Sequence, residues 1–491
     1  MLFRSKTQTE TFRGYGKLFS LAAQTAVECR FPEAAVLTAH ASVHLAGVEA
    51  GNGEVRYYGR THFSIVYEDA DRRVCRAEKG VEFSAIAKDA RVVPACSVRA
   101  QPAVENLSVR KEGASIFVTA LIGTDISVFG EQTFDYLAGG ELVCRRDPVN
   151  YFCAHLADGA TEVEDDFEVE NIGDILQHAE TVHLASVTCA AGILKAEGEV
   201  FLGLLALRGE ELVSFERLVP FAIEIPSDAA QTGCRARVEV SVPEISLSAD
   251  ADEESRAHIH ATLSLKATGV IYEQVAVSGV TDAFSKTNRV LLTYAQSDSE
   301  GAGETTQMTE RVSGRAALSS PVNFSDTLQA IVLARAEANL MRGNNGMHVE
   351  GVVIATLLVR GADGSHRGIE MSLPFSVPVQ TADAQVCVLA CGMSARQKEE
   401  GAIDAEATLK FTLTERIHAA ARLVAQAQEG EAVPVNDCAV SVYVPRAGDG
   451  LWELSKRLGK SPEEVLESNP DLEFPIREGQ RVVIYRKKTL G

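Results

Sequence analysis

Three stretches of the chain share one spacing of glycine, phenylalanine and cysteine, and this repetition constrains the fold more than any other feature. Anchored on Gly59, Gly198 and Gly351, each stretch reaches a phenylalanine after 24, 23 and 24 residues, and a cysteine after 13, 13 and 12 more. These partners are Phe83, Phe221 and Phe375, followed by Cys96, Cys234 and Cys387. A pattern that recurs at such a period indicates one structural unit in several copies.

The local signal within each copy is β, because apolar and polar residues alternate with a period of two. Clear examples are HIHATLSLKA at 258–267 and IDAEATLKFTL at 403–413. In RVEVSVPEISLS the alternation shifts at Pro243, as expected for a bulged or broken edge strand. Short strands with one solvent-exposed face favour an antiparallel sandwich for each copy.

Two stretches with few apolar residues, at 161–170 (TEVEDDFEVE) and 297–310 (SDSEGAGETTQMTE), are interpreted as linkers between separately folded copies. A chain of 491 residues exceeds one usual domain. The expected architecture is mainly β, with three tandem antiparallel β-sandwich-like repeats followed by a small domain. Its expected boundaries are 1–150, 151–300, 301–440 and 441–491.

The formal charge of −21 argues against nucleic-acid binding, which needs clustered Lys and Arg. No apolar run approaches the roughly 20 residues of a membrane span. The apolar stretch near the N-terminus ends at Gln24, so no secretory signal is expected and the chain is interpreted as cytoplasmic. Ten cysteines without a Cys-x-x-Cys pair fit reduced thiols in that compartment.

No residue pattern in the body predicts catalysis, a metal or a cofactor. Cys387 and Cys391 are four residues apart, but their apolar neighbours favour buried thiols over metal ligands. His258 and His260 lie on the polar face of an expected strand without a third ligand. Phosphate-loop and Gly-x-Ser-x-Gly motifs are absent from the sequence. We therefore expect a non-enzymatic protein.

The last 50 residues change from alternation to helical spacing. Leu451, Leu454 and Leu458 share one helical face, and Gly459 is placed to end that helix. The stretch SPEEVLESN predicts a second helix, with Ser461 and Glu464 as a capping box and proline at the first helical position. Strand-like runs at 440–444 and 481–486 flank both helices, so the expected order is β-α-α-β.

This pattern resembles the LysM family of small β-α-α-β modules. The residues that carry the resemblance are Tyr443, Val444, Gly448, Asp449, Leu451, Trp452, Asn469, Pro470, Gly479 and Gln480. The resemblance implies that Trp452, the only tryptophan in the chain, packs in the core of the small domain. It also implies that two loops bind a ligand or partner, with these site residues: Gly448, Asp449, Gly450, Leu451, Asn469, Pro470, Asp471 and Leu472.

LysM modules bind N-acetylglucosamine polymers such as chito-oligosaccharides and peptidoglycan. Here Gly450 replaces the usual serine or threonine, which removes a hydroxyl group that could bond to an acetamido group. Folding is therefore expected to tolerate this change better than sugar binding does. The tail from Ser441 onward carries nine Lys and Arg against eight Asp and Glu, so residues 1–440 carry −22 of the total charge.

Three β repeats followed by one LysM module resemble the SipL-type spore coat morphogenetic proteins, which combine SPOCS repeats with a C-terminal LysM domain. The Glu197-Gly198 and Pro220-Phe221 pairs, repeated at 350–351 and 374–375, support this resemblance. It implies a scaffold in the mother-cell cytoplasm whose LysM domain docks onto the coat-basement ATPase at the forespore surface. The alternative is peptidoglycan binding at the cell wall or spore cortex.

Overall fold

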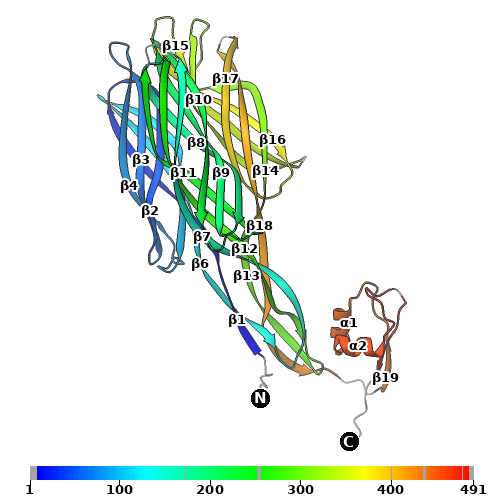
Figure 1. Ribbon diagram of the computed structural model, residues 1–491. Coiled ribbons are helices and arrows are strands. Elements are labelled where there is room, and N and C mark those ends of the chain that lie inside the picture. Colours follow the sequence, from blue (N-terminus) through cyan, green and yellow to red (C-terminus); the bar gives the residue numbers. More distant parts are fainter. Residues whose placement is uncertain are drawn as a thin grey trace.

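The computed structural model describes residues 8–170, 172–251, 256–344, 346–399, 401–434, 438–477 and 479–485, and its fold is mainly antiparallel β. Figure 1 shows a head of long strands that narrows into a stem, with a small tail beside the end of the stem. Both helices of the described residues lie in the tail. Neither of them is long and apolar enough to cross a membrane.

Among the described residues, eighteen strands form the head and stem, and their pairing follows a recurring order. The first set is β1 (Gln8–Pro32), β2 (Ala35–Ala50), β3 (Glu54–Glu68), β4 (Val74–Lys88), β5 (Ser97–Glu112) and β6 (Ser115–Gly139). It forms two three-stranded sheets, in the orders β1-β6-β5 and β2-β3-β4. A shared apolar core of residues such as Cys29, Phe63 and Val118 packs the two sheets together.

The next two sets repeat these pairings. The second set is β7 (Val143–Glu170), β8 (Ile175–Ala190), β9 (Ile193–Arg208), β10 (Glu211–Pro226), β11 (Arg235–Ala251) and β12 (Arg256–Phe284). The third set is β13 (Asn288–Leu318), β14 (Thr327–Gly343), β15 (Gly346–Arg360), β16 (His366–Val379), β17 (Ala384–Glu399) and β18 (Ala402–Ala432). In the third set the two sheets join edge to edge, because the end of β13 also pairs with β16.

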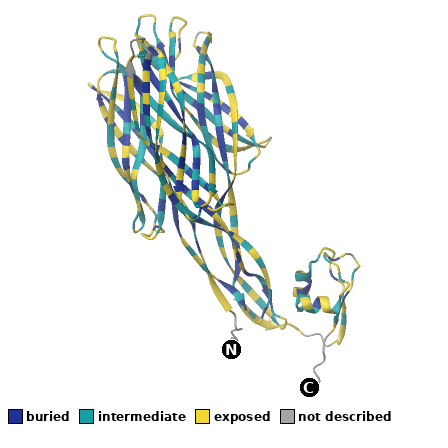
Figure 2. Ribbon diagram, in the orientation of Figure 1, coloured by how far each residue is buried: buried dark blue, intermediate teal, exposed yellow. Residues whose placement is uncertain are grey.

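The predicted alternation is confirmed where it was clearest. On β12, Ile259, Ala261, Leu263 and Leu265 are at most 1% exposed, and the apolar positions of 403–413 on β18 are at most 3% exposed. Figure 2 shows the resulting alternation of buried and exposed positions along the strands. The register shift expected at Pro243 is also present, between Ser241 and Glu244 of β11.

The two predicted linkers are wrong, because both lie inside long strands. Residues 161–170 belong to β7 and pair with β12, and residues 297–310 belong to β13 and pair with β18. In the first stretch, Val163, Phe167 and Val169 pack against the core of the second set. Glu162, Glu164, Asp166 and Glu168 occupy the other, exposed face of the strand, whereas Asp165 shares the apolar face and pairs there with Arg217. A charged run with period two can therefore be a strand with one solvent-facing side.

The three sets also share apolar clusters at positions that the repeat makes equivalent. Val66, Leu205 and Leu358 each follow an anchor glycine by seven residues, and all three are at most 1% exposed in one common cluster. Tyr136 and Leu423 join residues of β7 and β12 in a further cluster. The three sets are therefore in contact through apolar side chains. That each copy also folds on its own stays a prediction.

The tail consists of β19 (Val440–Tyr443), α1 (Leu451–Leu458), α2 (Pro462–Ser468) and β20 (Val482–Tyr485), with β19 and β20 paired antiparallel. The predicted capping box is confirmed: Ser461 accepts from the backbone N–H of Glu464, and the Glu464 side chain accepts from that of Ser461. Gly459 ends α1 in the left-handed conformation, with φ of 62°. This position favours glycine because a Cβ there is strained.

Candidate functional site

The two predicted binding loops of the tail both pack against one small core. Leu454, Val465, Ile476 and Val482 form this core and are at most 3% exposed. Leu451 from the first loop and Leu472 from the second pack against it. The 448–451 and 469–472 segments are therefore both anchored to the same apolar core.

Backbone hydrogen bonds fix the first loop against the segment that follows the second. The N–H of Gly448 donates to the carbonyl of Ile476 at 2.8 Å, and the N–H of Ile476 donates to the carbonyl of Asp449 at 3.0 Å. Gly448 has φ of 88°, a conformation that glycine adopts without strain. The loop geometry thus depends on Gly448, the first glycine of the Gly-Asp-Gly sequence.

The Asp449 carboxylate is held within the tail. Arg457 donates two hydrogen bonds to it, at 2.6 Å and 3.1 Å, and the backbone N–H of Arg446 donates a third at 3.0 Å. The bonds from Arg457 hold the pKa of Asp449 below its usual range. A carboxylate bound in this way anchors the loop to α1 and has little capacity left for a ligand.

Asn469 has a similar structural role at the end of α2. Its amide nitrogen donates to the carbonyls of Val465 at 3.0 Å and Val483 at 2.9 Å, and its carbonyl oxygen accepts from the N–H of Val483 at 2.7 Å. The side chain therefore ties α2 to β20. Pro470 and Asp471, which follow it, are exposed.

Gly450 is the N-cap of α1 and provides no side-chain capping bond. A Cβ at this position would approach Oε2 of Glu453 at 2.6 Å, which is the free end of a flexible and exposed side chain. The site thus has room for the serine or threonine that the LysM pattern usually carries. Of the predicted site residues, Gly448, Pro470 and Asp471 are exposed, and Gly450 is half-buried.

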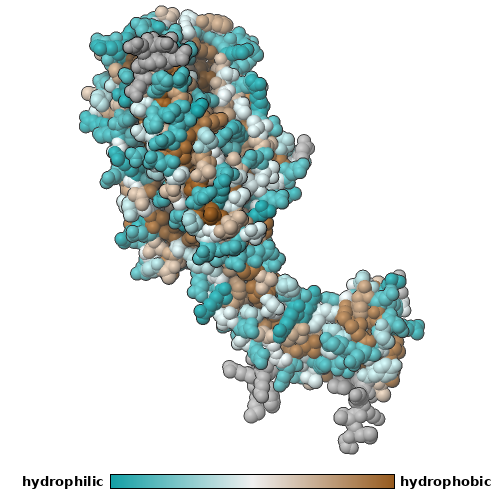
Figure 3. Space-filling view, viewed as in Figure 1, coloured by the Kyte–Doolittle hydropathy of each residue, from teal (hydrophilic) through white to brown (hydrophobic). Residues whose placement is uncertain are grey.

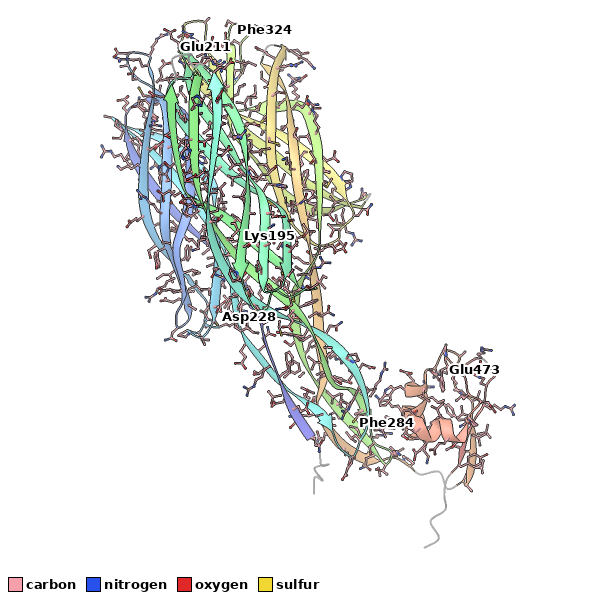
Figure 4. All side chains as sticks on the ribbon, viewed as in Figure 1. Lys195, Glu211, Asp228, Phe284, Phe324 and Glu473 are labelled. Atoms are coloured by element: carbon pink, nitrogen blue, oxygen red, sulfur yellow. The ribbon has the colours of Figure 1, made fainter. Side chains whose placement is uncertain are left out.

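Trp452 does not lie in the core of the tail, so that expectation is wrong. Its ring packs edge-on against Phe284 at the end of β12, with ring centroids 5.3 Å apart, and its indole N–H donates to Asp282 at 2.9 Å. Figure 4 labels Phe284 at the end of the stem, beside the tail. The leucines of α1 and the residues of α2 and β20 fill the small core without it.

Three ion pairs surround the tryptophan contact and cross from the tail to the stem. Lys456 donates to both carboxylate oxygens of Asp282 at 2.8 Å. Lys286 pairs with Glu464 at 3.0 Å, and Arg145 lies 3.8 Å from Glu453. Figure 3 shows the tail in contact with the stem end. Sequence reasoning missed the stem residues, because nothing local marks a residue whose partner lies 170 positions further along.

The body shows no metal constellation within the described part of the chain. His260 contacts Asp166 at 2.6 Å, and the side chains of His258 and His260 are about half exposed, on the polar face as predicted. Burial raises the pKa of the Cys387 and Cys391 thiols. Low thiolate content is the property of structural rather than reactive cysteines.

No protein-family model, curated protein or solved structure matches this chain.

Proposed function

We propose that this protein is a non-enzymatic scaffold of spore coat assembly, built from three copies of a six-stranded β unit and a LysM-like tail. In this proposal it acts in the mother-cell cytoplasm and is recruited to the forespore surface. The tail docks there onto a coat-basement protein, the ATPase that the family resemblance implies. The loops around Gly450 and Asp471 form the contact.

One observation carries the choice of a protein partner over a glycan. The side chains of Asp449 and Asn469 are occupied by Arg457 and by the backbone of the tail. Sugar recognition relies on a few well-placed polar groups that remain free to bond to hydroxyl and acetamido groups. With glycine at position 450, the exposed part of the loops offers backbone groups, a proline and one carboxylate, which suits a complementary protein surface.

The alternative remains binding of peptidoglycan or chito-oligosaccharide through the same loops. The observation in its favour is that Leu451 and Leu472 hold both loops on one core. Both functions use one surface, and a single pair of measurements separates them.

The test combines partner capture with calorimetry on the full chain. Asp471→Lys should weaken capture of the coat-basement ATPase from sporulating cells, whereas Glu467→Lys, the same charge change at an exposed position of α2, should not. Titration of the wild-type chain with chito-oligosaccharide should show no binding tighter than millimolar, a free energy of about −4 kcal/mol. Micromolar binding of the oligosaccharide, with capture unaffected by Asp471→Lys, would overturn the scaffold proposal in favour of the glycan alternative.

A further inference from the structure

The surface of α1 that faces the stem is a different surface from the two loops. Trp452 and Lys456 are four residues apart and so lie on one face of the helix. Asp282 and Phe284 are two residues apart on β12 and so lie on one face of the strand. The helix pair and the strand pair contact each other. Asp282 accepts hydrogen bonds from Trp452 and Lys456, and Phe284 packs against the tryptophan ring.

We propose that this face of α1 is a second recognition surface of the tail, specific for an extended Asp-x-Phe segment, and that the stem end occupies it as a releasable latch. This inference does not rest on the proposed function, because it concerns a contact within the chain. The segment on the stem reads Asp282-x-Phe284-x-Lys286, and the lysine adds the ion pair with Glu464. A partner that fits the released tail therefore presents a carboxylate, an aromatic ring and a cation at successive alternate positions.

The contact has the properties of a latch because its charges remain partly in water. Lys456 and Asp282 keep 45% and 24% of their side-chain surface exposed, and Lys286 and Glu464 keep 43% and 39%. Exposed pairs of this kind contribute little and are screened by salt. The tryptophan ring, its N–H bond and Phe284 supply the specific part of the contact, and no covalent or sheet connection reinforces it among the described residues.

The connection between stem and tail lets a released tail return. Residues 433–439 separate the end of β18 from the start of β19, and an extended chain of that length spans roughly 25 Å at most. A short tether keeps the tail at a millimolar effective concentration near the stem. A segment of another protein that binds the same face of α1 must compete with a stem end present at this effective concentration. Only a segment that binds more tightly than the stem end, or is very abundant, displaces it.

Trp452 reports directly on the latch, because it is the only tryptophan. In the full chain, Asp282→Ala should shift its emission to the red and increase its quenching by acrylamide. Asp298→Ala, an exposed carboxylate on β13 away from the tail, should change neither. Lys456→Ala provides a second variant that leaves the stem intact, and it should reproduce part of the effect. Circular dichroism checks that the variants keep the wild-type fold.

A peptide of residues 278–288 tests the recognition itself. Added to the Asp282→Ala chain, it should restore the blue emission and the protection from acrylamide, and the same peptide with Asp282→Ala should not. Equal quenching of the wild-type and Asp282→Ala chains would show that the latch does not form. Restoration by both peptides, or by neither at millimolar concentration, would remove the proposed Asp-x-Phe specificity. These outcomes leave the capture experiment on the loops unaffected, so the two proposals fail separately.

Discussion

Phe375 lies directly opposite Gly351 across β15 and β16, and its ring occupies the space that a side chain at position 351 would need. A Cβ there would come within 2.6 Å of Cζ of Phe375 and would also clash with the carbonyl oxygen of Glu337. The same direct pairing joins Gly198 to Phe221 and Gly59 to Phe83. The repeated spacing in the sequence is thus a cross-strand pair of glycine and phenylalanine, and at Gly198 and Gly351 the ring lies over the glycine.

Replacement of Gly351 by alanine should destabilise the protein, because a backbone carbonyl of a paired strand cannot move aside as a flexible side chain can. Overpacking of this kind costs about 1–3 kcal/mol. Gly314→Ala on β13 is the matched control, since its Cβ would meet Leu373 at an ordinary 3.5 Å. Denaturant melts of both variants check the prediction, and equal midpoints would contradict it.

Replacement of Phe375 by alanine should remove a side chain that is 8% exposed and packs against Phe411. The expected loss is roughly 3–5 kcal/mol for an aromatic core residue. Phe324→Ala, at a site 63% exposed, should leave the melting midpoint unchanged. Figure 4 places Phe324 at the end of the head far from the tail. A small loss for Phe375→Ala would mean that the aligned ring does not mark the core.

Replacement of Asn469 by alanine should unfold or loosen the tail, while the head stays intact. Two hydrogen bonds to Val483 of β20 and one to Val465 of α2 are lost, which corresponds to roughly 2–4 kcal/mol. Hydrogen exchange of residues 440–485, followed by mass spectrometry, separates the tail from the head. Asp471→Asn, an exposed change two residues further on, should preserve the exchange protection that Asn469→Ala removes.

Acid should open the contact between tail and stem. Burial raises the pKa of Asp282, but hydrogen bonds from Lys456 and Trp452 outweigh it and leave the pKa below the usual 3.8. Because the pKa of Asp282 is lower when the tail is docked, the docked state is favoured at pH values above the ordinary aspartate pKa. This stabilisation is lost as the pH falls through the lowered pKa. The other charged groups around the contact are Arg145 with Glu453 and Lys286 with Glu464.

Trp452 quenching should accordingly be constant from pH 7 to about 5 and rise below about 4, the range in which an aspartate titrates. In Asp282→Asn this acid-dependent rise should disappear, since the amide does not titrate. An identical pH profile in wild type and Asp282→Asn would assign the effect to other carboxylates. Far-UV circular dichroism at each pH distinguishes opening of the contact from loss of the fold.

The local features of this fold follow from the sequence where they depend on neighbours along the chain. Alternation predicts the buried faces of β12 and β18, and the capping box predicts the start of α2 at Pro462. Both are set by side chains within a few residues of one another. A low content of apolar residues does not identify a linker at 161–170 or 297–310. In the first stretch, Val163, Phe167 and Val169 keep the period of two that a strand requires.

The position of Trp452 could not be obtained in this way. An aromatic residue in the first turn of a helix can face the small core or a neighbouring body, and helical spacing alone does not distinguish the two. Leu454 and Leu458 already fill the core side of α1, and Phe284 belongs to a strand far away in sequence. Contacts between distant segments depend on how the parts come together, which a single sequence does not encode locally.

The cluster that joins Val66, Leu205 and Leu358 has a consequence for how such a chain arises. A polypeptide with one six-stranded set would expose the equivalent apolar position to water, and three copies would have to gather around an axis to cover it. Such a trimer falls apart on dilution, whereas three sets on one chain meet at a fixed effective concentration. Fusion of the copies therefore makes their association independent of how much protein the cell contains.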